Sequence, residues 1–403
     1  MDAGTQTGQE IYFNPWDEAF RANPYPHYRQ LYTRPPYLLN LFMPMALVAR
    51  YADAAAVLRD HERMSSVQPR IPGVEQQDLF GDTATVLFSD PPTHTRLRRL
   101  VSRAFTPKRI RDLEPRIREI TDTLLDRAEA KGELEVVADL ATPLPVMVIA
   151  EMLGVPAQEY AQFKHWSDRI IEGDNTPPGM PLPEEVRRAY SELREYFAKV
   201  IERRRHQPGE DLVSALVAAH EESDALTAEE LQAFVILLLL AGNETTTNLI
   251  GNGMLALGRH PDQLARLASD HSLLPRAIEE MLRYDGPVQS TVRYNKEPVP
   301  VGGTVIPAGS VVFVILAAAN RDPAQFPEPD RFDITREPNL HLAFGDGIHF
   351  CLGAALARLE GAIAFGSVLG RFPKIRLAEP EGAVAYKGSY FLRGLAALPM
   401  AIR

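Results

Sequence analysis

The only cysteine of this 403-residue chain lies in the stretch Phe344-Gly345-Asp346-Gly347-Ile348-His349-Phe350-Cys351-Leu352-Gly353. The apolar residues that follow recur at helical spacing, at Leu352, Leu356, Leu359 and Ile363. A helix is therefore expected to start beside Cys351, where unpaired backbone N–H groups and the helix dipole favour an anionic thiolate. Gly345 and Gly347 allow the preceding loop to turn tightly, and Gly353 leaves room for a flat ligand. A buried structural cysteine is the alternative interpretation.

With the residues that follow it, the stretch reads F-G-x-G-x-H-x-C-x-G-x-x-L-A-R, completed by Leu356, Ala357 and Arg358. This string resembles the haem-binding loop of the cytochrome P450 family. The resemblance implies haem b as cofactor, with the Cys351 thiolate as axial ligand of the haem iron. An anionic sulfur pushes electron density to the iron and favours O–O cleavage. It also implies that His349 hydrogen-bonds a haem propionate and that Phe344 packs beside the sulfur.

A helix is also predicted after Asp90-Pro91-Pro92, because proline is tolerated in a first helical turn. On this helix His94 and Arg98 share one face. The pair matches the family's propionate-binding residues, two donors that reach a carboxylate-bearing ligand. By the same resemblance, Arg293 is a further propionate-binding residue.

The opposite face of this helix carries Arg96, Arg99 and Arg103. The surrounding window from His94 to Arg111 contains no acidic residue, although the whole protein has a net charge of −10. A basic surface of this kind suits the docking of an acidic electron donor. A merely solvated charged face is the alternative.

A long helix is predicted from a capping box, Thr227 with Glu230, to about His260. Its centre is Ala241-Gly242-Asn243-Glu244-Thr245-Thr246, and a glycine and a carboxylate are both unfavourable inside an apolar helix. The segment is similar to the acid-alcohol motif of the P450 family. The resemblance implies that Thr245 hydrogen-bonds dioxygen or its water and that Glu244 relays protons from solvent. The Thr245 hydroxyl can also bond the carbonyl of Ala241, and small-residue helix packing is the alternative.

The resemblance places a substrate pocket near this motif. The residues expected to line it are Phe234, Leu237, Leu238, Ala241, Val288, Gln289, Ser290, Phe391 and Leu392. Taken singly, Phe234, Leu237 and Leu238 could equally belong to the core.

A structural network is expected from Glu280 and Arg283, an i, i+3 pair on a helix. They precede Glu328-Pro329-Asp330-Arg331-Phe332, in which Arg331 matches the third member of the family's Glu-Arg-Arg network. That network holds the haem loop in place, and loss of one buried partner should cost several kcal/mol.

Composition limits the class of protein. Apolar residues make up 45% of the chain and charged residues 24%, ordinary values for a globular protein with a large core. The net charge argues against binding to nucleic acid or an anionic membrane. The polar N-terminus lacks signal-peptide features, and the most apolar runs, Phe234–Gly242 and Val311–Ala319, are about nine residues long, too short for a membrane anchor. A single cysteine excludes an intramolecular disulfide and suits the cytoplasm.

We therefore expect a mainly α fold with small β-sheets, the cytochrome P450 fold, as a single domain at residues 23–403 after a flexible segment at 1–22. The resemblance implies monooxygenation, in which O2 hydroxylates or epoxidises a small apolar substrate. No nucleotide-binding glycine fingerprint is present, so electrons from NAD(P)H should arrive through a separate ferredoxin and its reductase. A peroxide-driven peroxygenase and a non-catalytic haem sensor are the alternatives.

Overall fold

The computed structural model describes residues 12–403 except 16, 34–35, 41–43, 70–78, 104, 174–175, 177–179, 221–225, 379–383, 388 and 390. The α-helices within these residues are α1 (Glu18–Ala22), α2 (Tyr25–Tyr32), α3 (Tyr51–Arg59), α4 (Thr93–Ser102), α5 (Pro107–Asp112), α6 (Glu114–Lys131), α7 (Pro143–Met152), α8 (Tyr160–Glu172), α9 (Glu184–His206), α10 (Leu212–His220), α11 (Ala228–Arg259), α12 (Pro261–Ser269), α13 (Leu274–Asp285), α14 (Leu316–Ala319) and α15 (Ala354–Arg371). The other helical turns are η1 (Val136–Ala141), η2 (Ala157–Glu159), η4 (His271–Leu273) and η5 (Gly347–His349).

The strands of the described residues form three small sheets. They are β1 (Tyr37–Asn40), β2 (Pro44–Val48), β3 (Met64–Ser65), β4 (Leu134–Glu135), β5 (Thr291–Asn295), β6 (Val299–Val301), β7 (Thr304–Ile306), β8 (Val311–Val314), β9 (Arg376–Leu377) and β10 (Pro399–Ala401). The largest sheet has the order β1-β2-β8-β5-β3, with β2 and β8 parallel and its other neighbours antiparallel. It brings strands from residues 37–65 together with strands from residues 291–314, and small sheets among many helices agree with the expected mainly α fold.

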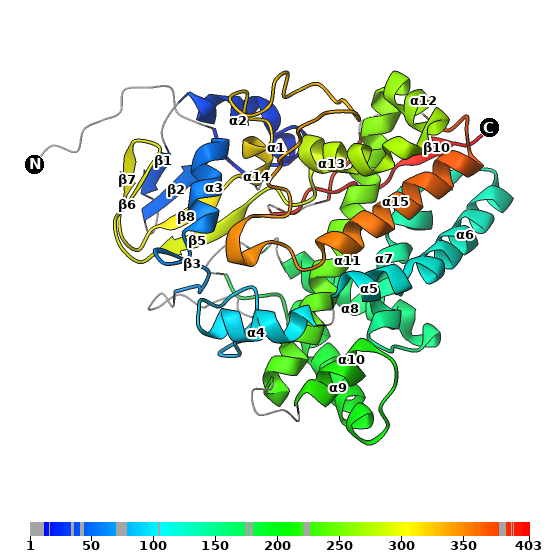
Figure 1. The fold of residues 1–403 in the computed structure, drawn as a ribbon, viewed down its shortest axis with the longest axis horizontal. Coiled ribbons are helices and arrows are strands. Elements are labelled where there is room, and N and C mark those ends of the chain that lie inside the picture. The colour runs from blue at the N-terminus through cyan, green and yellow to red at the C-terminus, as the bar shows by residue number, and fades with distance from the viewer. Residues whose placement is uncertain are drawn as a thin grey trace, which may run out of the picture.

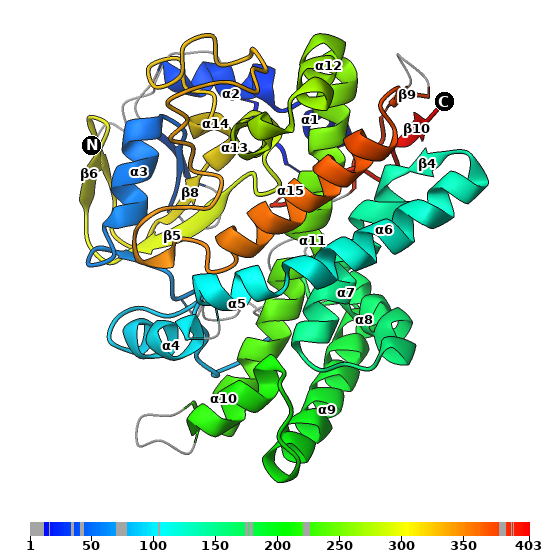
Figure 2. The same cartoon turned by 45° about the vertical axis from the view of Figure 1, so that its right-hand side comes forward.

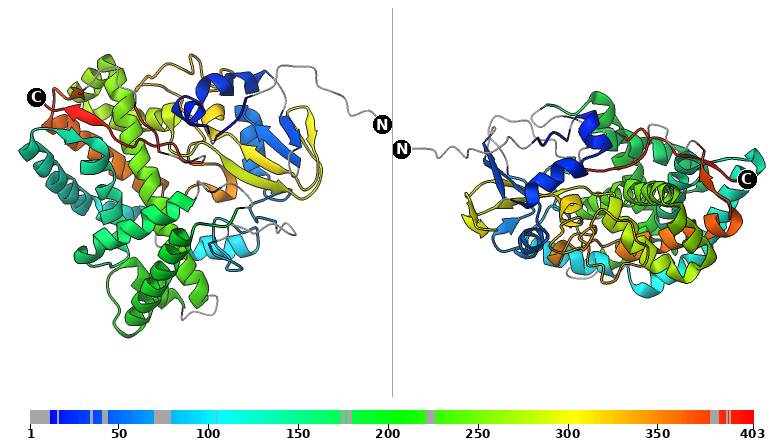
Figure 3. Two further views of the ribbon diagram at one scale, coloured as in Figure 1. Left: turned by 180° about the vertical axis from the view of Figure 1, so that it is seen from behind. Right: turned by 90° about the horizontal axis from the view of Figure 1, so that it is seen from above.

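The sheet lies to one side of a larger helical part (Figure 1). Seen from behind and from above, the two parts keep this side-by-side arrangement (Figure 3). Helix α11 runs through the helical part, and α15 crosses it (Figure 2). The main hydrophobic cluster draws on residues from Leu97 to Ile402, so chain segments far apart in sequence share one core.

Helix α11 is the central element of this core. The predicted capping box is present, because the Thr227 side chain accepts from the Glu230 N–H and the Glu230 carboxylate accepts from the Thr227 N–H. By length and composition alone, α11 is able to cross a membrane. The sequence did not indicate this, because only uninterrupted apolar runs were considered. The most apolar window of α11 is 72% buried inside the fold, so it is explained as a core helix.

The N-terminal boundary differs from the prediction. Residues 1–11 lie outside the described part, but Glu18–Ala22 form α1, capped by the Asp17 carboxylate. Phe20 is buried and packs edge-on against Tyr28 at a ring-centroid distance of 5.9 Å. The prediction of a flexible segment up to residue 22 is therefore wrong for Glu18–Ala22, because Phe20 anchors this turn in a hydrophobic cluster.

Candidate active site

The loop before Cys351 has the tight backbone that its glycines predicted. Gly345 and Gly347 adopt φ values of 70° and 68°, in the left-handed region that glycine tolerates best. A Cβ at Gly347 would lie 2.6 Å from the carbonyl oxygen of Leu58, so α3 leaves no room for a side chain there. The Cys351 N–H donates to the Phe344 carbonyl at 2.9 Å, which closes the loop on itself.

The helix begins later than predicted. Its N-cap is Gly353 and its first residue is Ala354, so Cys351 lies two residues before the cap. The Cys351 side chain is accessible to solvent, yet it lies deep enough that burial raises the pKa of its thiol. The N–H groups of Gly353 and Ala354 and nearby arginines lower that pKa by less. Without a bound cation the protein therefore favours the neutral thiol, contrary to the thiolate expected from the helix start, and a cation bound to the sulfur would reverse the balance.

Glu279 ties this loop to the neighbouring helices, a role the sequence did not reveal. Its carboxylate accepts two hydrogen bonds of 2.7 Å from the Arg358 guanidinium and one of 3.1 Å from His341. These partners outweigh burial and lower the pKa of Glu279 to about 2. The Arg358 guanidinium lies over the Phe344 ring at 4.5 Å. Glu279 therefore fixes the arginine that covers Phe344.

Two histidines from distant parts of the chain meet beside the loop. The rings of His94 on α4 and His349 have centroids 4.2 Å apart. Burial lowers both pKa values, that of His349 to about 3, so both rings are neutral at pH 7. His349 Nε2 bonds the Ser66 hydroxyl at 3.0 Å. Within the described residues, His94 Nε2 is buried without a partner.

Two arginines lie with these histidines and lack a carboxylate partner among the described residues. Arg98 donates to the Phe350 carbonyl at 2.7 Å, and Arg293 donates to the Val292 carbonyl at 2.8 Å. Arg293 is 7% exposed, and burial lowers its pKa to about 10. The nearest acid, Asp90, accepts instead from Ser65, Ser66 and Lys296. The cluster can therefore receive an anionic ligand, since buried unpaired cations are costly.

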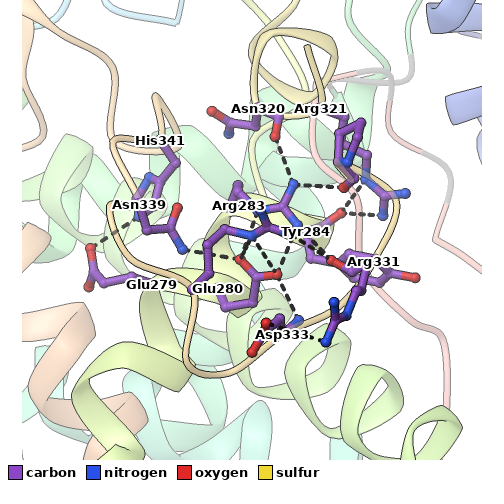
Figure 4. Close-up of polar contacts among 12 residues, drawn as sticks. Glu279, Glu280, Arg283, Tyr284, Asn320, Arg321, Arg331, Asp333, Asn339 and His341 are labelled. Atoms are coloured by element: carbon purple, nitrogen blue, oxygen red, sulfur yellow. Dashed lines mark hydrogen bonds and ion pairs between the residues drawn. The ribbon is translucent and has the colours of Figure 1, made fainter. Parts of the chain in front are cut away.

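Glu280 and Arg283 form the predicted buried pair on α13. Two hydrogen bonds of 2.7 and 2.8 Å join their side chains, and both side chains are 0% exposed. Figure 4 shows that Arg283 also reaches the segment before the cysteine loop, where it donates to the carbonyls of Asn320, Pro329 and Arg331. The pair therefore fastens that segment to α13.

The third member of the network was predicted wrongly. The Arg331 side chain is 58% exposed and pairs with Glu328 at 3.0 Å. It contributes to the network only through its carbonyl oxygen. Arg336, five residues later, donates from Nε to both Glu280 oxygens at 3.2 and 3.1 Å. The loop folds so that Arg336 points inward and Arg331 points to solvent.

One face of α11 is accessible where the acid-alcohol motif lies. Ala241 is exposed and Thr245 half-buried, whereas Asn243, Glu244 and Thr246 are buried. The Thr245 hydroxyl donates to the Ala241 carbonyl at 2.7 Å, which confirms the bond expected from the sequence. Such a bond competes with the helical ladder and loosens a helix locally.

Glu244, the acid of the pair, is 7% exposed. Its carboxylate accepts from the Lys387 ammonium at 2.9 Å. The two residues are 143 positions apart, so no local sequence pattern indicated this partner.

The predicted substrate-contact segments come together. Val288 and Leu392 form an antiparallel bridge, and the Gln289 N–H donates to the Phe391 carbonyl at 2.8 Å. Gln289, Ser290 and Leu392 line one cavity. On α11, Phe234, Leu237 and Leu238 are buried, and a role for them in substrate contact stays a prediction.

The comparisons with known proteins agree with this geometry. Residues 21–379 match the family model for cytochrome P450. The chain belongs to the cytochrome P450 family. It is 45% identical to the cytochrome P450 monooxygenase PikC of Streptomyces venezuelae, over 94% of this chain and 91% of that one. It is 43% identical to the 6-deoxyerythronolide B hydroxylase of Saccharopolyspora erythraea, over 88% and 89%. As a P450, the chain is an oxidoreductase of the monooxygenase class.

Solved structures support the fold. The myxobacterial cytochrome P450 CYP267B1, solved with myristic acid, superposes with a TM-score of 0.88 at 38% identity and covers 96% of this chain and 98% of its own. The PksS cytochrome P450 of Bacillus subtilis has the same TM-score and identity, over 97% and 100%. The predicted P450 fold is confirmed.

The residues present fit the haem-iron cofactor of the family. Cys351 offers a solvent-accessible sulfur, and a Cβ at Gly353 would meet nothing within 4 Å, so the backbone leaves open space beside it. The unpartnered His94 Nε2 and the two arginines without carboxylates supply the donors that two propionates need.

The outward-facing arginines of α4 do not all behave alike. Arg99 and Arg103 are exposed, as predicted. Arg96 instead donates two hydrogen bonds to the Glu230 carboxylate at the start of α11. The prediction of Arg96 as an outward docking residue is therefore wrong, because the capping glutamate of α11 lies within its reach.

Glu360 on α15 is a further buried acid that the sequence did not single out. It is 1% exposed, and within the described residues neither carboxyl oxygen has a hydrogen-bond partner. Burial raises its pKa to about 8, although the nearby Thr246 lowers it slightly. The sequence offered one sign of this buried acid, because Glu360 stands among mostly apolar residues in the helix that packs against α11.

Proposed function

We propose that this chain is a haem b monooxygenase that inserts one atom of O2 into an apolar organic substrate by hydroxylation or epoxidation. Electrons come from NAD(P)H through a separate ferredoxin and its reductase, and the enzyme works in the cytoplasm. The observation that carries the proposal is the accessible centre of α11, where the Thr245 hydroxyl bonds back to the exposed Ala241 and the buried Glu244 stands next to it.

The protein residues have separable tasks. Cys351 supplies the sulfur ligand, and His94, Arg98, Arg293 and His349 hold the propionates. Haem, when bound, supplies the redox chemistry that activates O2. The Thr245 hydroxyl, held by the Ala241 carbonyl, can turn to donate a hydrogen bond. Glu244 can hold and release a proton beside it.

The substrate side is proposed as an apolar pocket lined by the predicted residues of α11 and the two bridged segments. The names of relatives support an organic substrate. One is named for hydroxylation of 6-deoxyerythronolide B, another is named a vitamin D(3) 25-hydroxylase, and a solved relative holds myristic acid.

Oxygen consumption tests the proposed function. Purified protein with NADPH, a ferredoxin and its reductase should consume O2 faster when a spectrally binding apolar compound is present, and should form oxygenated product. Equal consumption with every binding compound would contradict monooxygenation and favour a haem sensor. Product formed only from hydrogen peroxide would favour a peroxygenase.

Thr245→Ala should uncouple electron use from product formation. Thr245 carries the hydroxyl that follows Glu244 directly on the helix, so its loss should lower product per NADPH by about tenfold and release the remainder as hydrogen peroxide. Peroxide and product are measured against NADPH consumed. Thr245→Ser, which keeps the hydroxyl, is the matched control, and tight coupling in the alanine variant would contradict the role of Thr245.

Reversing the exposed arginines of α4 should slow electron transfer. Arg99→Glu and Arg103→Glu are each expected to reduce the rate of reduction by ferredoxin by about fivefold at low salt and to flatten its salt dependence. Stopped-flow reduction measures this, and substrate affinity should not change. Arg96→Glu should instead lower thermal stability, because it breaks the pair with Glu230. Unchanged reduction kinetics in the Arg99 and Arg103 variants would rule out this face as the dock.

A further inference from the structure

A small cavity lies between N-terminal residues and the segment that precedes the C-terminus. About 30 Å³ of it is open to the centres of water molecules, which is room for one or two waters. It is the cavity that Gln289, Ser290 and Leu392 line, and its wall also includes Phe13, Phe20, Lys387 and Ser389. Because several of these side chains are polar, the cavity can hold water that has several partners.

Lys387 connects this cavity with the acid of the active site. Its side chain lines the cavity and is 35% exposed, while its ammonium contacts Glu244 Oε1 at 2.9 Å. The Glu244 side chain is only 9% exposed. A buried carboxylate is costly without a partner, and the Lys387 ammonium offsets that cost.

Backbone contacts fix the position of Lys387 along the axis of α11. The Lys387 N–H donates to the Gly394 carbonyl at 2.8 Å, and Tyr386 and Leu395 form a bridge. A Cβ at Gly394 would collide with the Asn248 amide, so the segment passes directly over Asn248. Asn248 follows Glu244 by four residues and lies on the same helix face. The ammonium therefore needs to span only one helical turn to reach Glu244.

We propose that Lys387 is a positioning residue that holds the Glu244 carboxylate in place, and that water arriving from the cavity that Lys387 lines recharges Glu244 with protons. A water that reaches the carboxylate gives it a proton and regains one from bulk solvent, and Glu244 passes the proton towards the Thr245 hydroxyl. The inference rests on the proposed monooxygenase function. It adds a lysine from the C-terminal segment, next to the substrate-contact residue Leu392, to the proton route.

The first test needs no turnover. In haem-loaded protein labelled with 13C-glutamate, the infrared carboxylate band that disappears in Glu244→Gln identifies Glu244. That band should shift in Lys387→Met and return in Lys387→Arg, which restores the charge. Lys131→Met, which breaks an exposed lysine–aspartate pair elsewhere, should leave it in place. An unmoved band in Lys387→Met would overturn the positioning role.

The second test uses turnover. Lys387→Met should lower kcat about three- to tenfold with little change in KM and should raise the solvent deuterium isotope effect on kcat. Lys387→Arg should recover at least half of the loss. The double variant Lys387→Met/Glu244→Gln should be no slower than Glu244→Gln alone, because Lys387 acts through Glu244. Multiplied losses, or an unchanged kcat in Lys387→Met, would overturn the inference. Absence of oxygen-dependent turnover in the unmodified protein would refute the proposed function, and the infrared band would still decide the role of Lys387.

Discussion

Arg283→Met should destabilise the protein by about 3–5 kcal/mol, because it leaves the carboxylate of Glu280 buried without its main counter-ion. Both side chains are fully buried, and Arg283 also donates to three backbone carbonyls of the segment that leads to the cysteine loop. The carbonyls of Asn320 and Pro329 would lose this donor as well, while the Arg331 carbonyl keeps a hydrogen bond from Arg336. We therefore expect weak haem retention together with low stability.

The measurement is urea unfolding followed by circular dichroism, with the haem content of the purified protein recorded alongside. Two arginines of the same segment serve as matched controls. Arg336→Met removes a second donor to Glu280. The Arg336 side chain is 10% exposed, and its loss should cost about 2–3 kcal/mol of unfolding free energy. Arg331→Met removes an exposed side chain and should cost about 0.5 kcal/mol or less. Equal losses in the Arg331 and Arg336 variants would contradict the corrected network.

The unfolding free energy of the unmodified protein should decrease as the pH rises above 5, and Glu360→Gln should abolish this decrease. The folded-state pKa of Glu360 is raised from 4.5 to about 8. Between these values the unfolded chain releases the proton and the folded chain keeps it, so stability falls as pH rises. The limit is about 1.4 kcal/mol per pH unit, or on the order of 4 kcal/mol between pH 5 and pH 8.

Unfolding free energies measured from pH 5 to pH 8 test this expectation. Glu360→Gln should match the unmodified protein at pH 5 within about 1 kcal/mol and exceed it by about 3 kcal/mol at pH 8. Glu337→Gln, a substitution of a glutamate whose side chain is 66% exposed, should keep the original pH dependence. If the unfolding free energy of Glu360→Gln depended on pH as that of the unmodified protein does, the Glu360 carboxyl would be ionised in the folded protein and the prediction would be wrong.

The sequence predicted those parts of the site that lie within a few residues of each other. Cys351 with its glycines, and Thr245 with Ala241, are set by local backbone rules, and the structure has the expected φ values and hydrogen bond. The helical nature of α11 followed from its capping box and apolar pattern.

Partners across long loops could not be predicted in this way. Arg331 and Arg336 are chemically identical and five residues apart, and only the path of the loop decides which one reaches Glu280. Arg96 looked outward on an isolated helix, but Glu230, 134 residues later, lies within its reach. The Lys387–Glu244 pair depends on a chain crossing at Gly394 that no local pattern encodes.

The carbon monoxide difference spectrum of the reduced protein tests the central claim, ligation of haem by the Cys351 thiolate, most directly. The unmodified protein should show the long-wavelength absorption band of a thiolate-ligated ferrous carbonyl complex. Cys351→His should lose that band even where it retains haem. Persistence of the band in Cys351→His, or its absence from the unmodified haem-loaded protein, would contradict this account.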